Sequence, residues 1–252
     1  MNAAAGARIL ELDLGNTRGK WRLLRGAETG ARGSLTTADL RAGRLPAEWG
    51  ALRPQRVRVA NVAGTAVAAA LEQGLRAQLD LPVEFARVES RCAGVSCAYR
   101  DVARLGVDRW LAVLAAFHRE PRAALIVDCG SAVTLDLVDN GGRHLGGYIL
   151  PGLDLMRRAL YQDTDAVQVA TSRETAMSLA PGRDTAAAVN RGLPLMVLGA
   201  IERAYSALAA DIGAAPRLWL TGGDGAFIAS LCALPHQLVP ELVLDGLALT
   251  NP

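Results

Sequence analysis

The chain has 252 residues, about half of them hydrophobic, and a formal net charge of +2. This length fits one large domain or two of about 120 residues, with enough apolar residues for a sizeable core. The small net charge, the scattered arginines and the scarce aromatic residues argue against a nucleic-acid-binding protein. No long apolar run suggests a membrane span, and the first eight residues do not resemble a secretory signal. We therefore expect a soluble, cytoplasmic protein.

The first half begins with two predicted strands that form a hairpin. RILELDLG (8–15) is apolar up to Asp13, and KWRLLRG (20–26) follows after a turn that contains glycine, asparagine and threonine. A β-α-β unit is predicted next, with a helix at 66–79 between two strands at 56–62 and 82–88. The segment GVDRWLAVLAAFHRE (106–120) has helical period. Its buried face is expected to contain Val107, Trp110, Leu111, Leu114 and Phe117.

The second half begins with three predicted strands within residues 123–152, two of them joined by a hairpin turn at Asn-Gly-Gly. A helix is predicted over residues 184–211, with a break or kink at Gly192 and Pro194. A strand, a glycine turn and a helix follow at 217–231. A strand and a helix then close the chain.

The opening hairpin recurs half a chain later. Each copy has an apolar strand, an aspartate, any residue, a glycine, a small polar residue and a second strand, as ILELDLGNT and LIVDCGSAVT. Asp13 and Asp128 are 115 positions apart. The repeat predicts two similar α/β halves, each a mixed sheet flanked by helices, with the boundary between residues 1–120 and 121–252.

The two repeated turns have the composition of a phosphate site. Glycine lets backbone N–H groups approach a ligand, and consecutive N–H groups form an anion-binding concavity. The aspartates suit a Mg²⁺ ion or its waters, which bridge phosphate oxygens. An Asx-type turn that merely closes a hairpin is the alternative for either copy alone. Two copies in matching contexts favour a pair of hairpins that bind a polyphosphate.

A third glycine turn, LTGGDG (220–225), lies between a strand and a helix, where it could contact a nucleotide. Many α/β turns have this composition, so the motif alone has little specificity.

Together the motifs resemble the type III pantothenate kinases, a family within the superfamily of acetate and sugar kinases, heat-shock chaperone ATPases and actin. The matching segments span nearly the whole chain in the order typical of the family. They are DLGNT (13–17), Tyr99 with LGVDRW (105–110), DCGSAVT (128–134), HLGGYILPGLDLM (144–156), DTAAAVNRG (184–192) and LTGGDG (220–225).

The resemblance implies two ribonuclease-H-like (actin-like ATPase) halves that phosphorylate pantothenate to 4′-phosphopantothenate, the first step toward coenzyme A. It places ATP, with Mg²⁺ that Asp13 helps to hold, and a monovalent cation, K⁺ or NH₄⁺, at Asp128. Family members vary at Lys20, so an ordinary surface lysine is the alternative there, and the position of Ser131 is usually threonine. The implied ATP-binding residues are Asp13, Leu14, Gly15, Asn16, Thr17, Arg18, Gly19, Lys20, Ser131, Gly222 and Gly223.

The resemblance also identifies Asp108 as the general base for the pantothenate hydroxyl, a role that fits phosphoryl transfer. Arg109 suits the pantothenate carboxylate, because a guanidinium can donate two parallel hydrogen bonds. Without the resemblance, an aspartate in this position is an ordinary helix N-terminal residue. The implied substrate-binding residues are Tyr99, Gly106, Val107, Asp108, Arg109 and Thr185.

Thr185 matches a contact that the family supplies from the second subunit, so a homodimer is expected. Two other functions stay open. Another small-molecule kinase of the superfamily is disfavoured by LGVDRW with its upstream tyrosine. An accessory transcriptional regulator of the same fold is disfavoured because Asp13, Asp108 and Asp128 are all present. The segment Tyr161–Pro181 contains no motif that supports a prediction.

Overall fold

A computed structural model describes residues 6–163, 170–172 and 176–251. This part of the chain divides into two compact units. The first contains residues up to Ala93, Tyr99–Ala115 and the chain from Val243 onward, and the second contains Gly94–Ala98 and Ala116–Leu242. The expected division into halves 1–120 and 121–252 stays a prediction. Part of Tyr161–Pro181, residues 164–169 and 173–175, lies outside the described residues.

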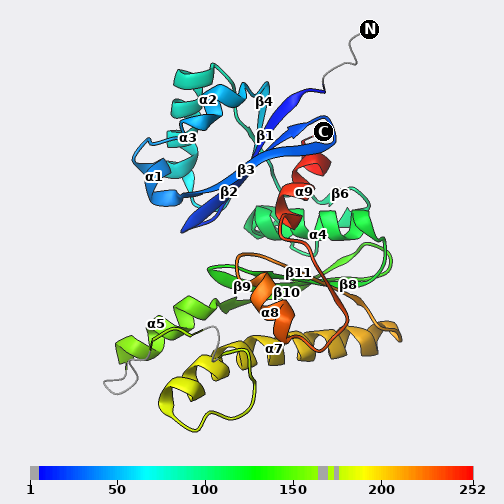
Figure 1. The fold of residues 1–252 in the computed structure, drawn as a ribbon. Helices are drawn as coiled ribbons and strands as arrows, with labels where there is room; N and C mark the ends of the chain where they lie inside the picture. Colours follow the sequence, from blue (N-terminus) through cyan, green and yellow to red (C-terminus); the bar gives the residue numbers. More distant parts are fainter. Residues whose placement is uncertain (1–5, 164–169, 173–175, 252) are drawn as a thin grey trace. The chain divides into compact units, whose positions relative to one another are not determined.

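The first unit is built on a five-stranded sheet with the order β3-β2-β1-β4-β5 (Figure 1). β1, β2 and β3 are antiparallel neighbours, whereas β1, β4 and β5 are parallel. The elements are β1 (Arg8–Leu14), β2 (Arg18–Arg25), β3 (Glu28–Thr36), α1 (Thr37–Arg41), α2 (Glu48–Leu52), β4 (Arg56–Asn61), α3 (Thr65–Leu79), β5 (Glu84–Phe85), β6 (Arg91–Cys92), the 3₁₀ helix Val102–Arg104, the start of α4 (Val107–Arg119) and α9 (Leu242–Thr250).

One face of this sheet is apolar and packs against helices. Alternate residues of a strand point to opposite faces, so the three leucines of β1 lie on the same side, and they are fully buried. They join one hydrophobic core with side chains of α1, α2 and α3. The core contains Leu10, Leu12, Leu14, Trp21, Leu23, Leu40, Trp49, Val57, Val59, Ala63, Val67, Leu71 and Leu75.

The second unit repeats the pattern, with the sheet order β10-β9-β8-β11-β12. β8, β9 and β10 are antiparallel, and β8, β11 and β12 are parallel. This match confirms the predicted α/β class with two similar halves. The elements are β7 (Val95–Ser96), the end of α4, β8 (Ala124–Cys129), β9 (Ala132–Val138), β10 (His144–Pro151), α5 (Leu153–Asp163), α7 (Thr185–Ile212), β11 (Arg217–Thr221), α8 (Gly225–Leu231) and β12 (His236–Leu238).

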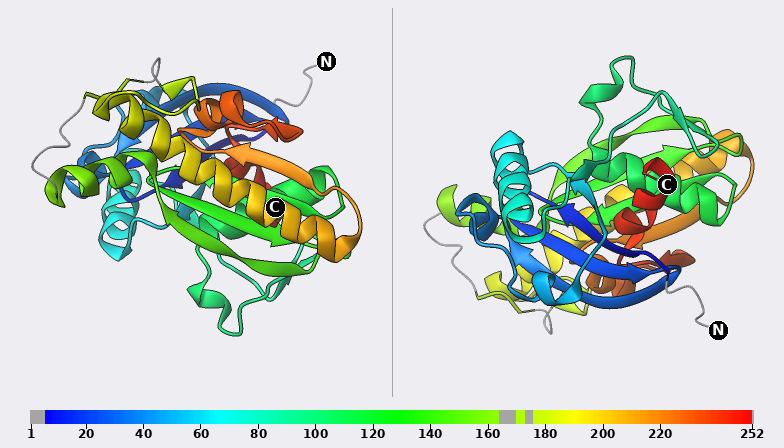
Figure 2. Two further views of the ribbon diagram at one scale, coloured as in Figure 1. Left: turned by 90° about the horizontal axis from the view of Figure 1, so that it is seen from below. Right: turned by 90° about the horizontal axis from the view of Figure 1, so that it is seen from above.

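The long helix α7 runs along the sheet of the second unit (Figure 2). The sequence predicts a break or a kink near Gly192 and Pro194. A break is wrong, because α7 is a single helix that contains Pro194, and a kink stays a prediction. Proline removes one backbone hydrogen bond, but Leu193, Val197 and Ile201 are buried in the core beneath the helix and hold it in place.

Within the described residues, α7 is also the single helix long and apolar enough to cross a membrane. Its buried side chains belong to the core of the second unit, and the core helix of a soluble protein meets the same criterion. Its length and composition are therefore weak evidence for a membrane span.

Helix α4 is covered on more sides than the single buried face that its sequence predicts. Every residue from Arg109 to Phe117 is buried, while Val107 is half-buried. The apolar period identifies the helix correctly. It could not reveal that the alanines between the large side chains would be covered as well.

Candidate active site

The first hairpin forms a turn with exposed polar residues above a buried strand pair. Leu14 pairs with Gly19, and the four residues 15–18 connect them. The Gly15 N–H donates to the Arg18 carbonyl at 3.1 Å, and the Thr37 hydroxyl donates to the Gly15 carbonyl at 2.6 Å. Residues 16–18 are exposed, so their backbone and side-chain donors are accessible to a ligand.

Asp13 and Lys20 are direct cross-strand partners. Paired residues of antiparallel strands project from the same face of the sheet, so the carboxylate and the ammonium group share one face. The side chain of Leu14 belongs to the core on the other face, and its carbonyl accepts the Val62 N–H at 3.0 Å. A Cβ on Gly19 would contact the side-chain ends of Leu14 and Leu35, so a larger residue there would require these leucines to shift.

The second hairpin has a tighter turn. Cys129 pairs with Val133, and three residues connect them. The Gly130 N–H donates to the Ala132 carbonyl at 3.0 Å. Ser131 is exposed at the tip, so its hydroxyl is accessible. The neighbouring Cys129 thiol is buried, and burial raises its pKa, so this cysteine is an unreactive core residue.

Two further glycine segments pack against the second hairpin. The Gly152 N–H donates to the Ser131 carbonyl at 3.2 Å, and the Asp224 N–H donates to the Cys129 carbonyl at 2.9 Å. Gly222 has a φ of +91°, and a Cβ there would collide with Asp128 Oδ1 and the Cys129 backbone. The predicted residues Asp128, Ser131, Gly222 and Gly223 are therefore brought together within the second unit.

The predicted substrate residues of the first unit also come together, at the start of α4. The buried Arg109 donates from Nη1 to the Tyr99 hydroxyl at 3.1 Å, and its Cζ lies 5.9 Å from the centroid of the Tyr99 ring. The Asp108 carboxylate accepts the Arg109 N–H at 2.8 Å. A Cβ on Gly106 would collide with Asp108 Oδ1, so the glycine leaves room for the carboxylate.

Thr185 is the first residue of α7 and is exposed. The preceding Asp184 caps the helix by accepting the Ala187 N–H at 2.8 Å, which fixes the backbone at Thr185. The second unit also has exposed apolar side chains. They include Leu195 (53% exposed) and Met196 (63%) on α7, and Tyr148 and Ile149 on β10.

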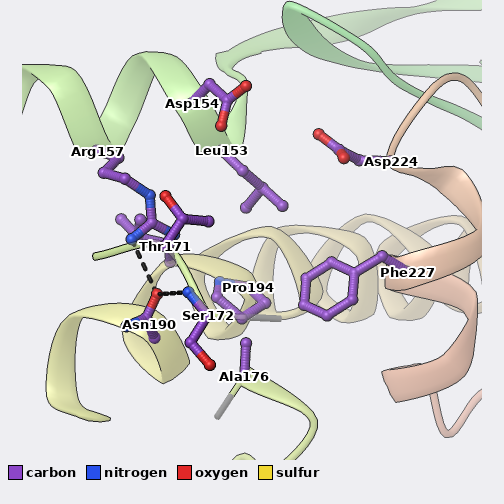
Figure 3. A pocket seen from close by; sticks show the side chains of 11 residues that line it. Leu153, Asp154, Arg157, Thr171, Ser172, Ala176, Asn190, Pro194, Asp224 and Phe227 are labelled. Carbon is purple, nitrogen blue, oxygen red and sulfur yellow. Dashed lines mark hydrogen bonds between the residues drawn. The ribbon is translucent and has the colours of Figure 1, made fainter. Parts of the chain in front are cut away.

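A small cavity of about 40 Å³ lies between α5, α7 and α8 (Figure 3). The buried Arg157 donates to the side chain of Asn190 at 2.9 Å. Asn190 also accepts the Ser172 N–H and donates to the Ala170 carbonyl. The VNRG motif in the sequence gives no sign that its asparagine joins α5, α7 and the segment 170–172.

Thr37 is another residue that the sequence did not reveal, since no motif marks a threonine twenty residues after the turn that it supports.

Among the described residues, no group of three or more histidine, cysteine, aspartate or glutamate side chains could hold a metal ion. Mg²⁺ in kinases is typically bound by one or two carboxylates, water and the substrate phosphates. A single carboxylate next to a glycine turn, as at Asp13 and Asp128, fits that mode.

The two sheets have the same strand order, and each contains a glycine hairpin that follows an aspartate, which is the architecture predicted for an actin-like fold. Comparisons with known proteins agree. A family model for type III pantothenate kinase matches residues 9–207. The type III pantothenate kinase of Chromohalobacter salexigens is 41% identical over 97% of this chain and 87% of its own length. The chain belongs to the type III pantothenate kinase family.

Solved structures support the fold. A crystal structure from Campylobacter jejuni, described as a conserved putative Baf family transcriptional activator, has a TM-score of 0.62, 22% identity and 95% coverage of both chains. A putative 2-dehydro-3-deoxygalactonokinase from Sinorhizobium meliloti has a TM-score of 0.58 and 14% identity, with coverage of 95% of this chain and 97% of its own. At these identities the likeness concerns the fold alone.

Proposed function

We propose that this protein transfers the γ-phosphoryl group of ATP to the hydroxyl of pantothenate, forming 4′-phosphopantothenate. The family membership supports the reaction. The observation that carries the assignment of residues is the pre-ordered group at the start of α4, where Arg109 is held against Tyr99 beside Asp108.

In this proposal Asp108 is the general base. Phosphoryl transfer depends mainly on positioning and charge neutralisation, and a carboxylate within hydrogen-bond reach of the hydroxyl orients it and accepts its proton. The hydrogen bond from the Arg109 N–H fixes one carboxylate oxygen. Gly106 and Val107 provide the backbone that places Asp108 at the first turn of α4.

Arg109 binds the pantothenate carboxylate. The planar guanidinium can donate two parallel hydrogen bonds to an incoming carboxylate. Contact with Tyr99 restricts the guanidinium before substrate arrives, which lowers the entropy lost on binding.

The proposed ATP-binding residues are those of the first hairpin in the first unit, and those of the second hairpin and the TGG turn in the second unit. Polar groups of residues 16–18 and the Ser131 hydroxyl serve as donors to phosphate oxygens, and Lys20 supplies a positive charge. Mg²⁺, when bound, neutralises phosphate charge. Asp13 is its expected protein ligand, and Asp128 is the expected ligand of K⁺ or NH₄⁺. Gly222 and Gly223 leave space for the nucleotide beside Asp128.

The protein acts as a cytoplasmic homodimer in which Thr185 reaches the pantothenate site of the neighbouring subunit. The exposure of Thr185 and of the apolar side chains on α7 and β10 supports a partner on this unit.

A coupled ADP-release assay with ATP, Mg²⁺, K⁺ and pantothenate tests the proposal. Turnover should require pantothenate and should fall when Na⁺ replaces K⁺. No turnover above background would overturn the reaction. Sedimentation at micromolar concentration should give a dimer, and a monomer would contradict the role of Thr185.

A further inference from the structure

A group of buried charged side chains lies outside the residues proposed to contact ligands. Glu11 on β1 (0% exposed), Arg22 on β2 (6%) and Arg58 on β4 (5%) are adjacent on one face of the first sheet. Arg22 donates to one oxygen of Glu11 at 2.8 Å, and Arg58 approaches the other at 3.3 Å.

The group extends to the C-terminal helix. Arg22 Nη1 donates to Oδ1 of Asp245, in the first turn of α9, at 2.7 Å. Arg22 therefore bridges a strand near the beginning of the chain and a helix at its end. The four side chains carry two positive and two negative formal charges, so their sum is zero.

Helix α9 has apolar and backbone contacts besides this bridge. Val243, Leu244 and Leu247 of α9 are buried, and a Cβ on Gly246 would collide with the backbone of Leu111. The helix thus packs closely against α4, as the adjacent ribbons in Figure 2 show. Buried ion pairs are expensive to desolvate, and apolar replacements are often as stable, so fixing a particular geometry is their best-attested use.

The bridge lies next to the proposed phosphate residues. Glu11 and Asp13 are two positions apart on β1, and Arg22 and Lys20 are two positions apart on β2, so all four project from the same face. Two residues along a strand span about 7 Å. A restraint on Arg22 therefore acts on β1 and β2 at the cross-strand pair two residues away from Asp13 and Lys20.

We propose that Arg22 and Asp245 are positioning residues for ATP: by tying α9 to β2, they hold Asp13 and Lys20 in the direction that the phosphates require. The inference rests on the proposed function, since it assumes that this hairpin binds ATP.

The test compares Asp245→Ala, Asp245→Asn and a control. The side-chain amide in D245N keeps an oxygen that can accept from Arg22, so this variant should retain most of the restraint. The control is Glu84→Gln, which removes the charge of Glu84 from its 2.6 Å ion pair with Arg56 at the far edge of the same sheet. Equilibrium binding of a fluorescent ATP analogue without pantothenate, and the two KM values, are measured for each variant.

D245A should weaken analogue binding and raise the KM for ATP about tenfold, while the KM for pantothenate changes less than about twofold. For D245N, analogue affinity and both KM values should stay within about threefold of wild type. For E84Q, they should stay within about twofold. The inference is overturned if folded D245A binds the analogue as wild type does, if both KM values rise equally, or if D245N is as impaired as D245A.

Analogue binding keeps the two proposals separate. If wild-type protein binds the analogue but does not phosphorylate pantothenate, the proposed function fails, and the effect of D245A on binding still decides the inference. If D245A does not fold, Arg22→Lys provides the decision, because a lysine lacks the planar guanidinium that bonds Glu11 and Asp245 at the same time. R22K should weaken analogue binding; analogue affinity equal to that of wild type in folded R22K, with a lowered melting temperature, would assign the bridge a structural role alone and overturn the inference.

Discussion

The two hairpins have the same sequence pattern and sheet position, yet they are supported in different ways. In the first, Thr37 holds the turn, because its hydroxyl donates to the Gly15 carbonyl and its N–H donates to the Thr17 carbonyl at 3.1 Å. In the second, the turn is held by backbone N–H groups of two separate segments, at Gly152 and Asp224. The second turn is therefore packed against neighbouring backbone at Gly152 and Gly222 more closely than a Cβ would allow.

The residue pairs below the two aspartates differ as well. Beneath Asp13 the cross-strand pair is Glu11 with Arg22, and beneath Asp128 it is Ile126 with Asp136. Asp136 lies 2.9 Å from the buried imidazole of His144, within its own sheet. The pair below Asp13 therefore leads by charge to a distant helix, whereas Asp136 in the pair below Asp128 contacts a histidine of its own sheet.

The largest effect that separates the hairpins is expected from their aspartates. Asp13→Asn and Asp128→Asn should each lower kcat/KM about 100-fold, because each removes charge from a proposed ion site in the phosphoryl-transfer machinery. Their ion dependence should differ. D13N should raise the Mg²⁺ concentration needed for half-maximal turnover, and D128N should abolish the preference for K⁺ over Na⁺.

Asp211→Asn, at an exposed position near the end of α7, controls for loss of a negative charge and should behave as wild type. Identical ion profiles for D13N and D128N would contradict the assignment of different ions to the two hairpins.

A large effect on stability is expected in the second hairpin alone. Gly222→Ala places a Cβ against Asp128 and Cys129 at a positive φ and should lower the free energy of unfolding by about 3 kcal/mol. Gly223→Ala, with no atom within 4 Å of its Cβ, is the matched control and should cost less than about 1 kcal/mol. Denaturant unfolding measures both. Equal costs would mean that the TGG turn does not pack against the hairpin as described.

The corresponding support of the first hairpin is weaker. Thr37→Val removes the hydroxyl that donates to the Gly15 carbonyl and should cost about 1 to 2 kcal/mol. Hydrogen exchange should increase at the Gly15 N–H and stay unchanged at Gly130. Equal protection at Gly15 in wild type and T37V would show that the hydroxyl does not hold the turn.

The smallest effects are expected for two Arg–Glu pairs, one in each unit. Arg56 holds the pKa of Glu84 below its usual value, and Arg217 does the same for Glu120. Partly exposed pairs contribute at most about 1 kcal/mol each. A lowered pKa means that this contribution is present above the ordinary value near 4.5 and is lost as pH falls through the folded-state value.

Glu84→Gln and Glu120→Gln should therefore destabilise slightly at about pH 7, and the difference from wild type should vanish in acid. Unfolding measured between about pH 7 and pH 3 checks the sign. A difference that grows toward low pH would contradict the ion-pair explanation.

The sequence predicted both hairpins because each contains an apolar strand, a glycine turn and a second strand. It did not predict β3, whose residues Glu28–Thr36 are mostly exposed and show no apolar alternation. It overestimated the effect of Pro194, because local propensity could not account for the core that holds α7.

For the candidate site, the resemblance assigns Tyr99 and Arg109 to one substrate site, and the structure places the two side chains in contact; their role as substrate-binding residues stays a prediction. The bridge from Glu11 through Arg22 to Asp245 had no local signal, since its members come from opposite ends of the chain. A glutamate within an amphipathic strand is normally expected to face solvent. Only tertiary contacts reveal that Glu11 is buried.

The proposed reaction is tested most directly by detection of 4′-phosphopantothenate with mass spectrometry after incubation with ATP, Mg²⁺, K⁺ and pantothenate. We expect wild-type protein to form it and Asp108→Asn to form it at least about 100 times more slowly, with ATP-analogue binding unchanged. Product formed by D108N at the wild-type rate would contradict Asp108 as general base, and no product from the wild-type protein would contradict the proposed reaction itself.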